Sequence, residues 1–411
     1  MITRLRESVQ FKIYFYVILL VAIYSASYDM YVASFPLLQA HFQANTGHIQ
    51  FSLTIFVLAS VITGIPVGIL SDLYGRKKCL IGLIILAFIG TWMCVFSINL
   101  YEFYVGRGLQ GIGGAGIFVV AISIPRDLLK GEAFLKVWQW LTLIFYIAPS
   151  IASAIGGYLA FHFNWQSTFW VILILALFAL GVILFTFKET SSPIKNTDDG
   201  SSKTKIIQNY KRVGLDPKFL TYCYITAVTW AGMALYYVIT PFIVMSQLGH
   251  TAVFFGWMMF SMVVSGVVGR ALQIILFRRF LSLEALTVVF SILNVLSVLS
   301  IFLIFLLPGN AVIFILVFSS LAFGFTSSIS AVAGSSLALK SFDKSLSATA
   351  ATLYGLMIDL IIFLVLVISP VLPASALTLA IVLTGLTSLG LLFLWIIYTI
   401  CPAHQPDAQA H

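Results

Sequence analysis

The feature that most constrains this chain is a series of apolar runs, each about twenty residues long, that fills almost its whole length. A bilayer core of about 30 Å needs roughly 20 apolar residues per helix. Of the 411 residues, 61% are hydrophobic and 9% are charged, whereas soluble domains carry roughly 25% charged residues. The sequence therefore predicts an all-α protein embedded in the lipid bilayer, with little length left for a soluble domain.

Charge, Gly and Pro interrupt the apolar runs and predict twelve transmembrane helices in two sets of six. We expect them at 11–36, 48–70, 79–98, 101–124, 137–160 and 168–187, and at 218–245, 253–276, 285–306, 311–339, 346–368 and 375–400. The organisation is thus a six-helix bundle at 1–187, a linker at 188–217, and a second bundle with a short tail at 218–411. In transporters with this 6+6 repeat the substrate binds near the midplane between the halves.

The distribution of Lys and Arg predicts the orientation. Loops that follow even-numbered helices are basic, as at Arg76 to Lys78, whereas loops that follow the odd-numbered helices hold no Lys or Arg. By the positive-inside rule both termini and the linker are cytoplasmic, and we expect a multi-pass protein of the bacterial inner membrane. The net charge of +8 is then a topology signal and does not indicate nucleic-acid binding.

The first run outlines a signal peptide, with Arg4 and Arg6 before it and a small-residue site at 25–27. It continues to Pro36, however, so we expect an uncleaved first helix. The four cysteines lack metal-binding spacing and the six histidines lie in loops or the tail, so we expect no metal and no cofactor. Residues 111–116 read G-I-G-G-A-G, which without a preceding strand or a P-loop Lys favours close helix packing.

Charged residues inside a membrane are costly and indicate function by default. Asp29 lies about seven residues before the outer end of the first helix and Arg107 about six residues after the outer start of the fourth, so both are roughly 10 Å deep. This equal depth permits an ion pair and a carboxylate that changes protonation as its cavity opens. The alternatives are a headgroup-level cap for Asp29 and snorkelling for Arg107.

Two further charges lie in the second half. Asp359 is near the middle of the eleventh helix and is open to a functional or a hydrogen-bonded structural role. Arg270, a turn and a half from the inner end of the eighth helix, is expected to snorkel inward. A vertical offset of roughly 12 Å argues against direct pairing of the two.

Aromatic and amide residues near these charges are candidates for lining a small-molecule site, because such sites combine aromatic walls with a few polar groups. Generic helix packing and interfacial belts explain them equally well. The candidates are Tyr28, Tyr31, Gln110, Tyr146, Trp230, Tyr236, Tyr237 and Tyr354.

The sequence resembles the major facilitator superfamily, and within it the drug:proton antiporters of the bicyclomycin and chloramphenicol resistance type. Residues 68–77 read G-I-L-S-D-L-Y-G-R-K and fit the superfamily pattern G-x-L-S-D-x-x-G-R-K. Asp29-Met30-Tyr31 with Pro36 is similar to the D-M-Y-x-x-x-x-P of the bicyclomycin branch. Residues 107–111, R-G-L-Q-G, resemble the helix 4 motif whose Arg is tied to proton coupling.

The resemblance implies conformational roles for one further set of residues. Asp72 is expected to face the start of the eleventh helix, whose dipole suits a carboxylate, and Arg76 to pair with Asp127. Residues 148–157 resemble the helix 5 motif of exporters, although Ser153 stands where this branch often has a second Pro. The residues to which the resemblance gives gating roles are Gly68, Asp72, Gly75, Arg76, Asp127, Pro149, Gly156 and Gly157.

These observations lead to a function. We expect a monomeric, proton-coupled secondary transporter that exports small amphiphilic molecules by alternating access, with Asp29, Arg107 and Asp359 as the proton-coupling candidates and the proton gradient as the energy source. An importer, or an exporter of metabolites or siderophores, is the alternative of the same fold. A membrane enzyme or a sensor is disfavoured, because the sequence shows no catalytic cluster at a membrane face and no sizeable soluble domain.

Overall fold

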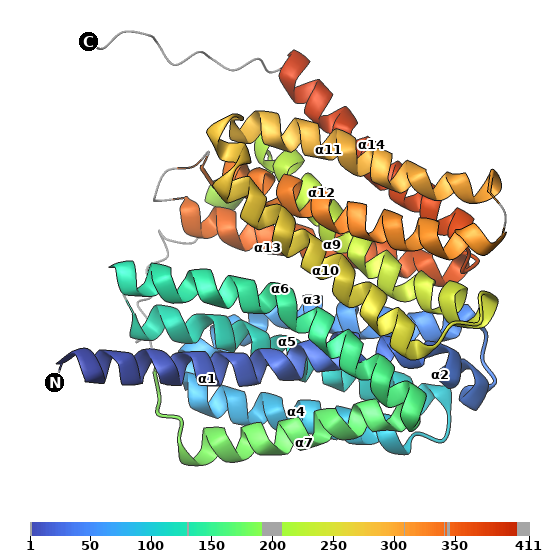
Figure 1. Ribbon diagram of the computed structural model, residues 1–411. Coiled ribbons are helices and arrows are strands. Elements are labelled where there is room, and N and C mark those ends of the chain that lie inside the picture. Colours follow the sequence, from blue (N-terminus) through green and yellow to red (C-terminus); the bar gives the residue numbers. More distant parts are fainter. Residues whose placement is uncertain are drawn as a thin grey trace, which may run out of the picture. The chain divides into compact units, whose positions relative to one another are not determined.

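The computed structural model describes residues 2–129, 131–190, 208–307, 309–340, 342 and 346–400, and every regular element within these ranges is helical (Figure 1). Twelve helices in this part are long and apolar enough to cross a membrane, as the hydrophobic runs predict. Most of the predicted linker and the tail after Ile400 lie outside the described residues.

The first six spans comprise eight helical elements, three of which begin at an asparagine cap. Asn45, Asn99 and Asn164 each accept a backbone N–H bond through the side chain, at 2.9, 3.0 and 2.9 Å, which satisfies a donor that the first helical turn leaves free. The elements are α1 (Ile2–Asp29), η1 (Met30–Ser34), α2 (Phe35–Phe42), α3 (Thr46–Tyr74), α4 (Arg76–Phe96), α5 (Leu100–Leu128), α6 (Gly131–His162) and α7 (Trp165–Phe185).

The last six spans include several short non-α segments. The elements are α9 (Pro217–Pro241), the π-helical η2 (Phe242–Gln247), α10 (Ala252–Ile275), η3 (Phe277–Arg279), α11 (Leu283–Leu299), η4 (Ser300–Phe305), η5 (Gly309–Ala311), α12 (Val312–Lys340), α13 (Ser347–Ile368), η6 (Ser369–Val371) and α14 (Ala376–Ile400). The predicted spans match these helices to within a few residues at most ends.

The first span departs from the single helix predicted at 11–36. The α-helix ends at Asp29, continues as the 3₁₀ segment η1, and resumes as α2 to Phe42. Pro36 explains the break, since its ring nitrogen has no hydrogen to donate to the preceding turn; Phe35 instead closes a tight turn onto the Val32 carbonyl. The 3₁₀ interruption places Asp29 at a junction of two helical pieces.

The chain forms two compact units that do not follow its two halves. The first unit contains Met1–Thr197, Leu235–Val264 and Phe363–Ala376, and the second contains Asp198–Ala234, Ser265–Ile362 and Leu377–His411. Within the first unit, α3 binds segments from the other half of the sequence. Gln50 Nε2 donates to the Val238 carbonyl at 3.3 Å, and Thr54 Oγ1 donates to the Leu366 carbonyl at 2.8 Å.

Glycines in α5 allow very close packing on α3 and α4. A Cβ on Gly113 would lie 2.5 Å from the Ala87 nitrogen, and one on Gly111 would lie 2.5 Å from the Phe56 carbonyl oxygen. Only residues without a side chain fit at these positions. The prediction that residues 111–116 serve helix packing is confirmed.

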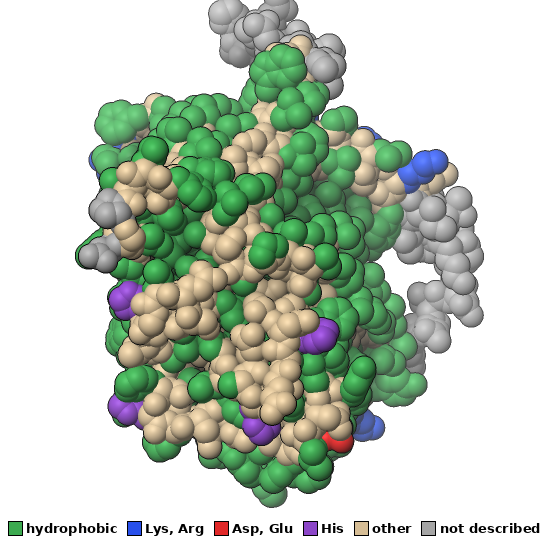
Figure 2. Space-filling view, turned by 90° about the vertical axis from the view of Figure 1, so that its right-hand side faces the viewer, with side chains coloured by type: hydrophobic (Ala, Val, Ile, Leu, Met, Phe, Trp, Pro, Cys, Tyr) green, Lys and Arg blue, Asp and Glu red, His purple; other side chains and the backbone are tan. Residues whose placement is uncertain are grey.

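The outer surfaces of the helices suit a lipid environment. Figure 2 looks onto the right-hand ends of the helices in Figure 1, where hydrophobic and uncharged polar groups make up most of the face and few charged side chains appear. Large apolar residues such as Ile174 and Trp395 are 63% and 62% exposed. A helix that is apolar all round, as α7 is, belongs in a core or a bilayer.

Candidate functional site

Asp29 is buried at the end of α1, in the first unit. Its side chain is 3% exposed, and it is the only buried carboxylate in the described part of the chain. The Tyr237 hydroxyl of α9 lies near enough to interact electrostatically with Asp29 and with the Ser153 side chain of α6. On the following residue, the Met30 carbonyl packs directly on Gly156, where a Cβ would clash.

Arg107 of α5 is fully buried and does not pair with Asp29. Its Nη1 donates to the Ser27 carbonyl at 2.8 Å and to Gln110 Oε1, and its guanidinium lies 3.9 Å from the centroid of the Tyr31 ring. A second ring, that of Phe56, lies at 4.6 Å. Aromatic faces stabilise a desolvated cation, so the guanidinium is held inside the bundle and does not snorkel.

The absence of an ion pair between Asp29 and Arg107 corrects one expectation from depth. Equal depth along two helices does not fix the direction in which each side chain points. Arg107 is directed at the carbonyl two residues before Asp29, while the carboxylate interacts electrostatically with Tyr237. The two charged residues therefore lie at similar depth along their helices but do not form an ion pair.

Gln110 connects Arg107 to α4. Its Nε2 donates to Thr91 Oγ1 at 2.9 Å, and the Thr91 hydroxyl donates to the Ala87 carbonyl at 2.7 Å. Gln110 is fully buried, so its amide is committed to this chain of bonds between α5 and α4. The geometry favours a supporting role for Gln110 over the predicted contact with substrate.

Several buried polar atoms around the end of α1 have no hydrogen-bond partner among the described residues. They include the hydroxyls of Ser27, Ser153 and Tyr237, and two nitrogens of Arg107. The Tyr237 and Ser153 side chains interact, but neither completes a hydrogen bond of normal geometry. Buried groups of this kind are normally satisfied by water or a ligand, which makes the surroundings of Asp29 the polar centre of the first unit.

Tyr28 belongs to an aromatic cluster beside this centre. Its ring stacks on Tyr24 at 6.3 Å between centroids and meets Phe56 edge-on at 5.7 Å. Tyr24 also contacts Phe118, and Phe118 contacts Phe145, at 4.9 and 5.3 Å. Tyr24 and Tyr28 are partly exposed. These two rings form an aromatic wall whose exposed part can contact an apolar molecule.

The other predicted aromatic residues differ in how accessible they are. Tyr31 is fully buried and its hydroxyl bonds Ser52 at 3.2 Å, so it serves the core rather than a surface. Tyr146, Tyr236 and Tyr237 are 4%, 0% and 2% exposed, respectively. Trp230 is half-buried on the part of α9 that belongs to the second unit.

The two charges of the second unit are separate from each other. Arg270 was expected to snorkel toward the end of α10, and this prediction is wrong. Its Nε donates to Ser328 Oγ in the interior of α12, at 3.1 Å. Tyr354 of α13 lies within electrostatic reach of Arg270. Asp359 has an exposed side chain and forms no ion pair with Arg270 within the described residues.

A charged cluster joins the end of α3 to the end of α5, within the first unit. Arg76 forms ion pairs with Asp72 at 2.6 Å and with Asp127 at 2.9 Å, so the pairing with Asp127 that the family resemblance implies is present. Ser71 accepts a further bond from Arg76 at 2.5 Å. The start of α13, which Asp72 is expected to face, belongs to the second unit, and that contact stays a prediction.

Glu189 is a member of this cluster that sequence reasoning missed. Its carboxylate accepts from the backbone N–H groups of Arg76 and Lys77, at 2.8 and 3.1 Å, and so caps α4. Thr190 Oγ1 donates to Asp127 at 3.2 Å. The only available signal was an acidic residue just after the sixth span, and its partners lie 112 and 113 residues away.

The remaining predicted gating residues are glycines and a proline. Gly75 has a φ of 92°, which strongly favours glycine, and Gly68 has open space around it. Pro149 lies inside α6. Further along the same helix, Gly157 packs on the Ala252 carbonyl of α10, and a Cβ on Gly256 would lie 2.8 Å from the Ser153 carbonyl.

Comparison with known proteins identifies the family. A family model described as Major Facilitator Superfamily matches residues 17–366. The chain belongs to the major facilitator superfamily, a class of membrane transporters.

Among curated proteins, the chain is similar to "Multidrug resistance protein MdtL" of Escherichia coli O81 (strain ED1a), at 32% identity over 171 residues. The protein of the same name from Shigella dysenteriae serotype 1 (strain Sd197) is 31% identical over 182 residues. The matches cover 42% and 44% of this chain, and 44% and 46% of the relatives, respectively. The chain thus aligns with somewhat less than half the length of the curated relatives it matches.

Solved structures share the fold over nearly the whole chain. A D-xylose-proton symporter superimposes with a TM-score of 0.73 at 15% identity, covering 93% of this chain and 96% of that one. The nucleoside transporter NupG, in a point-mutant form, gives a TM-score of 0.75 at 10% identity and covers 95% and 100%, respectively. At such identities the likeness shows the fold alone.

Proposed function

We propose that this protein is a proton-coupled exporter of small amphiphilic molecules that works by alternating access in the bacterial inner membrane, with both termini cytoplasmic. The observation that carries the proposal is the isolated Asp29 carboxylate. It is buried, lacks an ion-pair partner among the described residues, and lies where α1 breaks. Desolvation disfavours a lone charge, so a change in access to water is coupled to gain or loss of a proton.

The surroundings of Asp29 connect protonation to movement. Tyr237 reaches it from α9 and Gly156 of α6 packs on the next residue. Both contacts involve segments that come together at one end of the first unit, where Thr54 also binds the Leu366 carbonyl of α13. We assign this end to the outer side, so that a proton arriving at Asp29 from outside weakens its closure.

The aromatic wall of Tyr24 and Tyr28 supports an amphiphilic substrate. The multidrug relatives agree with this class, although the matched region covers less than half of each of them. Arg76, Asp72, Asp127 and Glu189 are assigned to the cytoplasmic side, where their ion pairs and helix cap stabilise one conformation. We further assign a monomer, with protons and the lipid bilayer as its other partners and no nucleic-acid ligand.

The direct test is transport in everted membrane vesicles. With a panel of aromatic amphiphiles that includes ethidium and chloramphenicol, we expect uptake of at least one compound on acidification of the lumen, and collapse of that uptake when the gradient is dissipated. Asp29→Asn should lose the gradient-driven uptake, and Gly64→Ala, which changes an open position in α3, should keep it. Uptake that is unaffected by the gradient would exclude proton coupling.

An importer of the same fold remains the second candidate, because family membership does not define direction. Proton-driven uptake into intact cells, with no uptake into everted vesicles, would show that the protein is an importer.

Reporter fusions at Asn45, Asn310 and Pro373 should score as external. External labelling of the linker in intact cells would overturn the assigned topology.

A further inference from the structure

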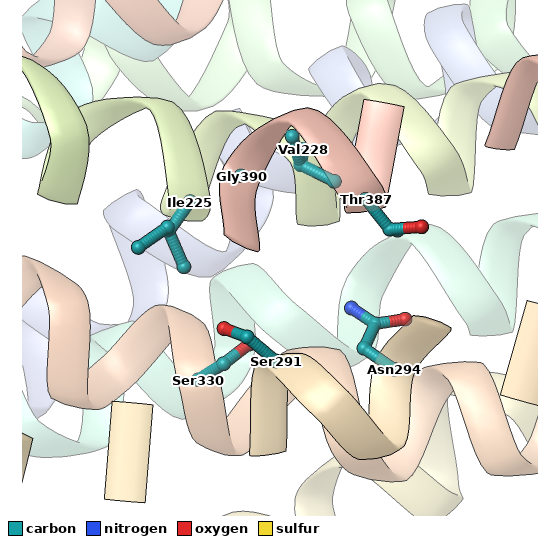
Figure 3. Close-up of a pocket in the computed structure, with 7 residues that line it drawn as sticks. All are labelled: Ile225, Val228, Ser291, Asn294, Ser330, Thr387 and Gly390. Atoms are coloured by element: carbon teal, nitrogen blue, oxygen red, sulfur yellow. The ribbon is translucent and has the colours of Figure 1, made fainter. Parts of the chain in front are cut away.

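A small cavity with a mixed polar and apolar lining lies in the second unit, where α9, α11, α12 and α14 meet. Its volume is ≈ 10 Å³, close to the minimum that holds one water molecule. In Figure 3, polar side chains of α11 and α12 face Thr387 of α14 and the apolar side chains of α9 across the cavity. The polar lining residues are Ser291, Asn294, Ser330 and Thr387.

The Asn294 side chain gives the strongest evidence that the cavity holds a ligand. Its side chain is 4% exposed and lines the cavity, and its Oδ1 has no hydrogen-bond donor among the described protein groups. A buried acceptor left without a donor loses the hydration that it has in the unfolded chain. Native structures satisfy nearly all such atoms, with ordered water where protein donors are lacking.

The neighbouring hydroxyls add acceptors rather than donors. Thr387 Oγ1 donates its hydrogen to the Leu383 carbonyl at 2.8 Å, and Ser330 Oγ donates to the Ser327 carbonyl at 3.0 Å. Because each hydroxyl hydrogen is used within its own helix, the lone pairs remain for the cavity. Ser291 is the exception, since its hydroxyl makes no hydrogen bond within the part of the protein that the structure describes.

We propose that this cavity is a binding site for one water molecule. The water donates to Asn294 Oδ1 and to the hydroxyl oxygen of Thr387 or Ser330, and it accepts from the Ser291 hydroxyl. It thereby connects α11 to α12 or α14 through hydrogen bonds in the interior of the second unit. The site includes none of the residues assigned to transport, so it is independent of the proposed function.

Water fits the site better than a metal cation. A monovalent ion in a membrane interior needs a compensating charge or many oxygen ligands, and no carboxylate lines this cavity. A water molecule can both donate and accept, so it matches the Asn294 Oδ1 acceptor together with the donors and acceptors of the other polar side chains that line the cavity.

The test adds a methyl group to the wall of the cavity through Gly390→Ala. Gly390 lines the cavity, and a Cβ there would lie 3.6 Å from the Tyr224 ring and 3.9 Å from Ile225, which is ordinary contact. Alanine also favours helix over glycine, so a dry site predicts an unchanged or raised apparent melting temperature. The control is Gly385→Ala on the same helix, where the new methyl meets open space.

If water is bound, Gly390→Ala displaces it and leaves Asn294 unsatisfied. We expect the apparent melting temperature in detergent to fall by about 2–4 °C relative to Gly385→Ala. In an Asn294→Leu background, where no acceptor needs the water, the same Gly390→Ala change should cause no fall. An experimental map of the wild-type protein should show density within hydrogen-bonding distance of Asn294 Oδ1.

Three results would overturn the proposal. The first is equal stability of Gly390→Ala and Gly385→Ala in the wild-type background. The second is an experimental map at water-resolving quality without density in the cavity, which decides the matter even if Asn294→Leu fails to fold. The third is stabilisation of the wild-type protein by sodium or lithium chloride but not by potassium chloride, which would assign the site to a cation.

Discussion

Gly75→Ala tests the charged cluster around Arg76, and in particular the cap that Glu189 forms on α4. Gly75 has φ 92° and ψ 151°, a region essentially restricted to glycine, in which other residues are strained by about 1–3 kcal/mol. The new Cβ would also lie 2.5 Å from Glu189 Oε2. Displacing that carboxylate removes the cap of α4, which costs about 0.5–2 kcal/mol. We expect a total loss of about 1.5–5 kcal/mol.

The assay is the apparent melting temperature of purified protein in detergent, with Gly64→Ala in α3 as the control, because a Cβ there meets nothing within 4 Å. A Glu189→Ala background separates the two contributions, since only the backbone strain should then remain. The reasoning fails if Gly75→Ala is as stable as the control. Its steric part fails if the cost is the same with and without Glu189.

Substitutions at three further positions test the carboxylate, the helix packing and the closure of the first unit. Asp29→Asn should remove proton-driven transport and flatten its dependence on pH, because an amide does not titrate, while Asp29→Glu should keep part of it; vesicle uptake at several pH values measures both. Gly113→Ala should destabilise by about 1–3 kcal/mol through overpacking, since its Cβ would lie 2.5 Å from the Ala87 nitrogen; an unchanged melting temperature would contradict close packing of α4 and α5. Thr54→Val should raise the rate of thiol labelling at Ser369→Cys, in a cysteine-free background, by about fivefold, because it removes one hydrogen bond to α13 worth about 1 kcal/mol; an unchanged rate would show that this bond does not hold the closure.

The sequence was sufficient for those features that depend on pattern along the chain. Twelve apolar runs of bilayer length predict twelve helices, and residues 111–116 predict close packing because small residues are needed wherever two backbones approach. The ion pair of Arg76 with Asp127 followed from family resemblance, and the structure contains it.

The features that the sequence did not predict depend on rotation about helix axes and on distant partners. Asp29 and Arg107 have similar depth, but they do not pair: Arg107 donates to the Ser27 carbonyl, and Asp29 lies within electrostatic reach of Tyr237. Gln110 is a candidate for lining a site or for helix packing from sequence alone, and the structure shows its amide bonded to Thr91 of α4. Glu189 caps a helix more than a hundred residues earlier in the chain, and no local pattern reports such a contact.

The very short connections of the first six spans limit how this half of the sequence can move. Gly75 alone separates α3 from α4, and three residues separate α4 from α5. With Phe163 and Asn164 as the whole connection between α6 and α7, adjacent helices are tied in pairs and cannot slide far past each other. The hydrogen-bond ladder of the first span changes type at η1, which marks a place where this span can bend. Asp29 lies at that hinge. The first six spans can therefore bend at the same place where a buried carboxylate can gain or lose a proton.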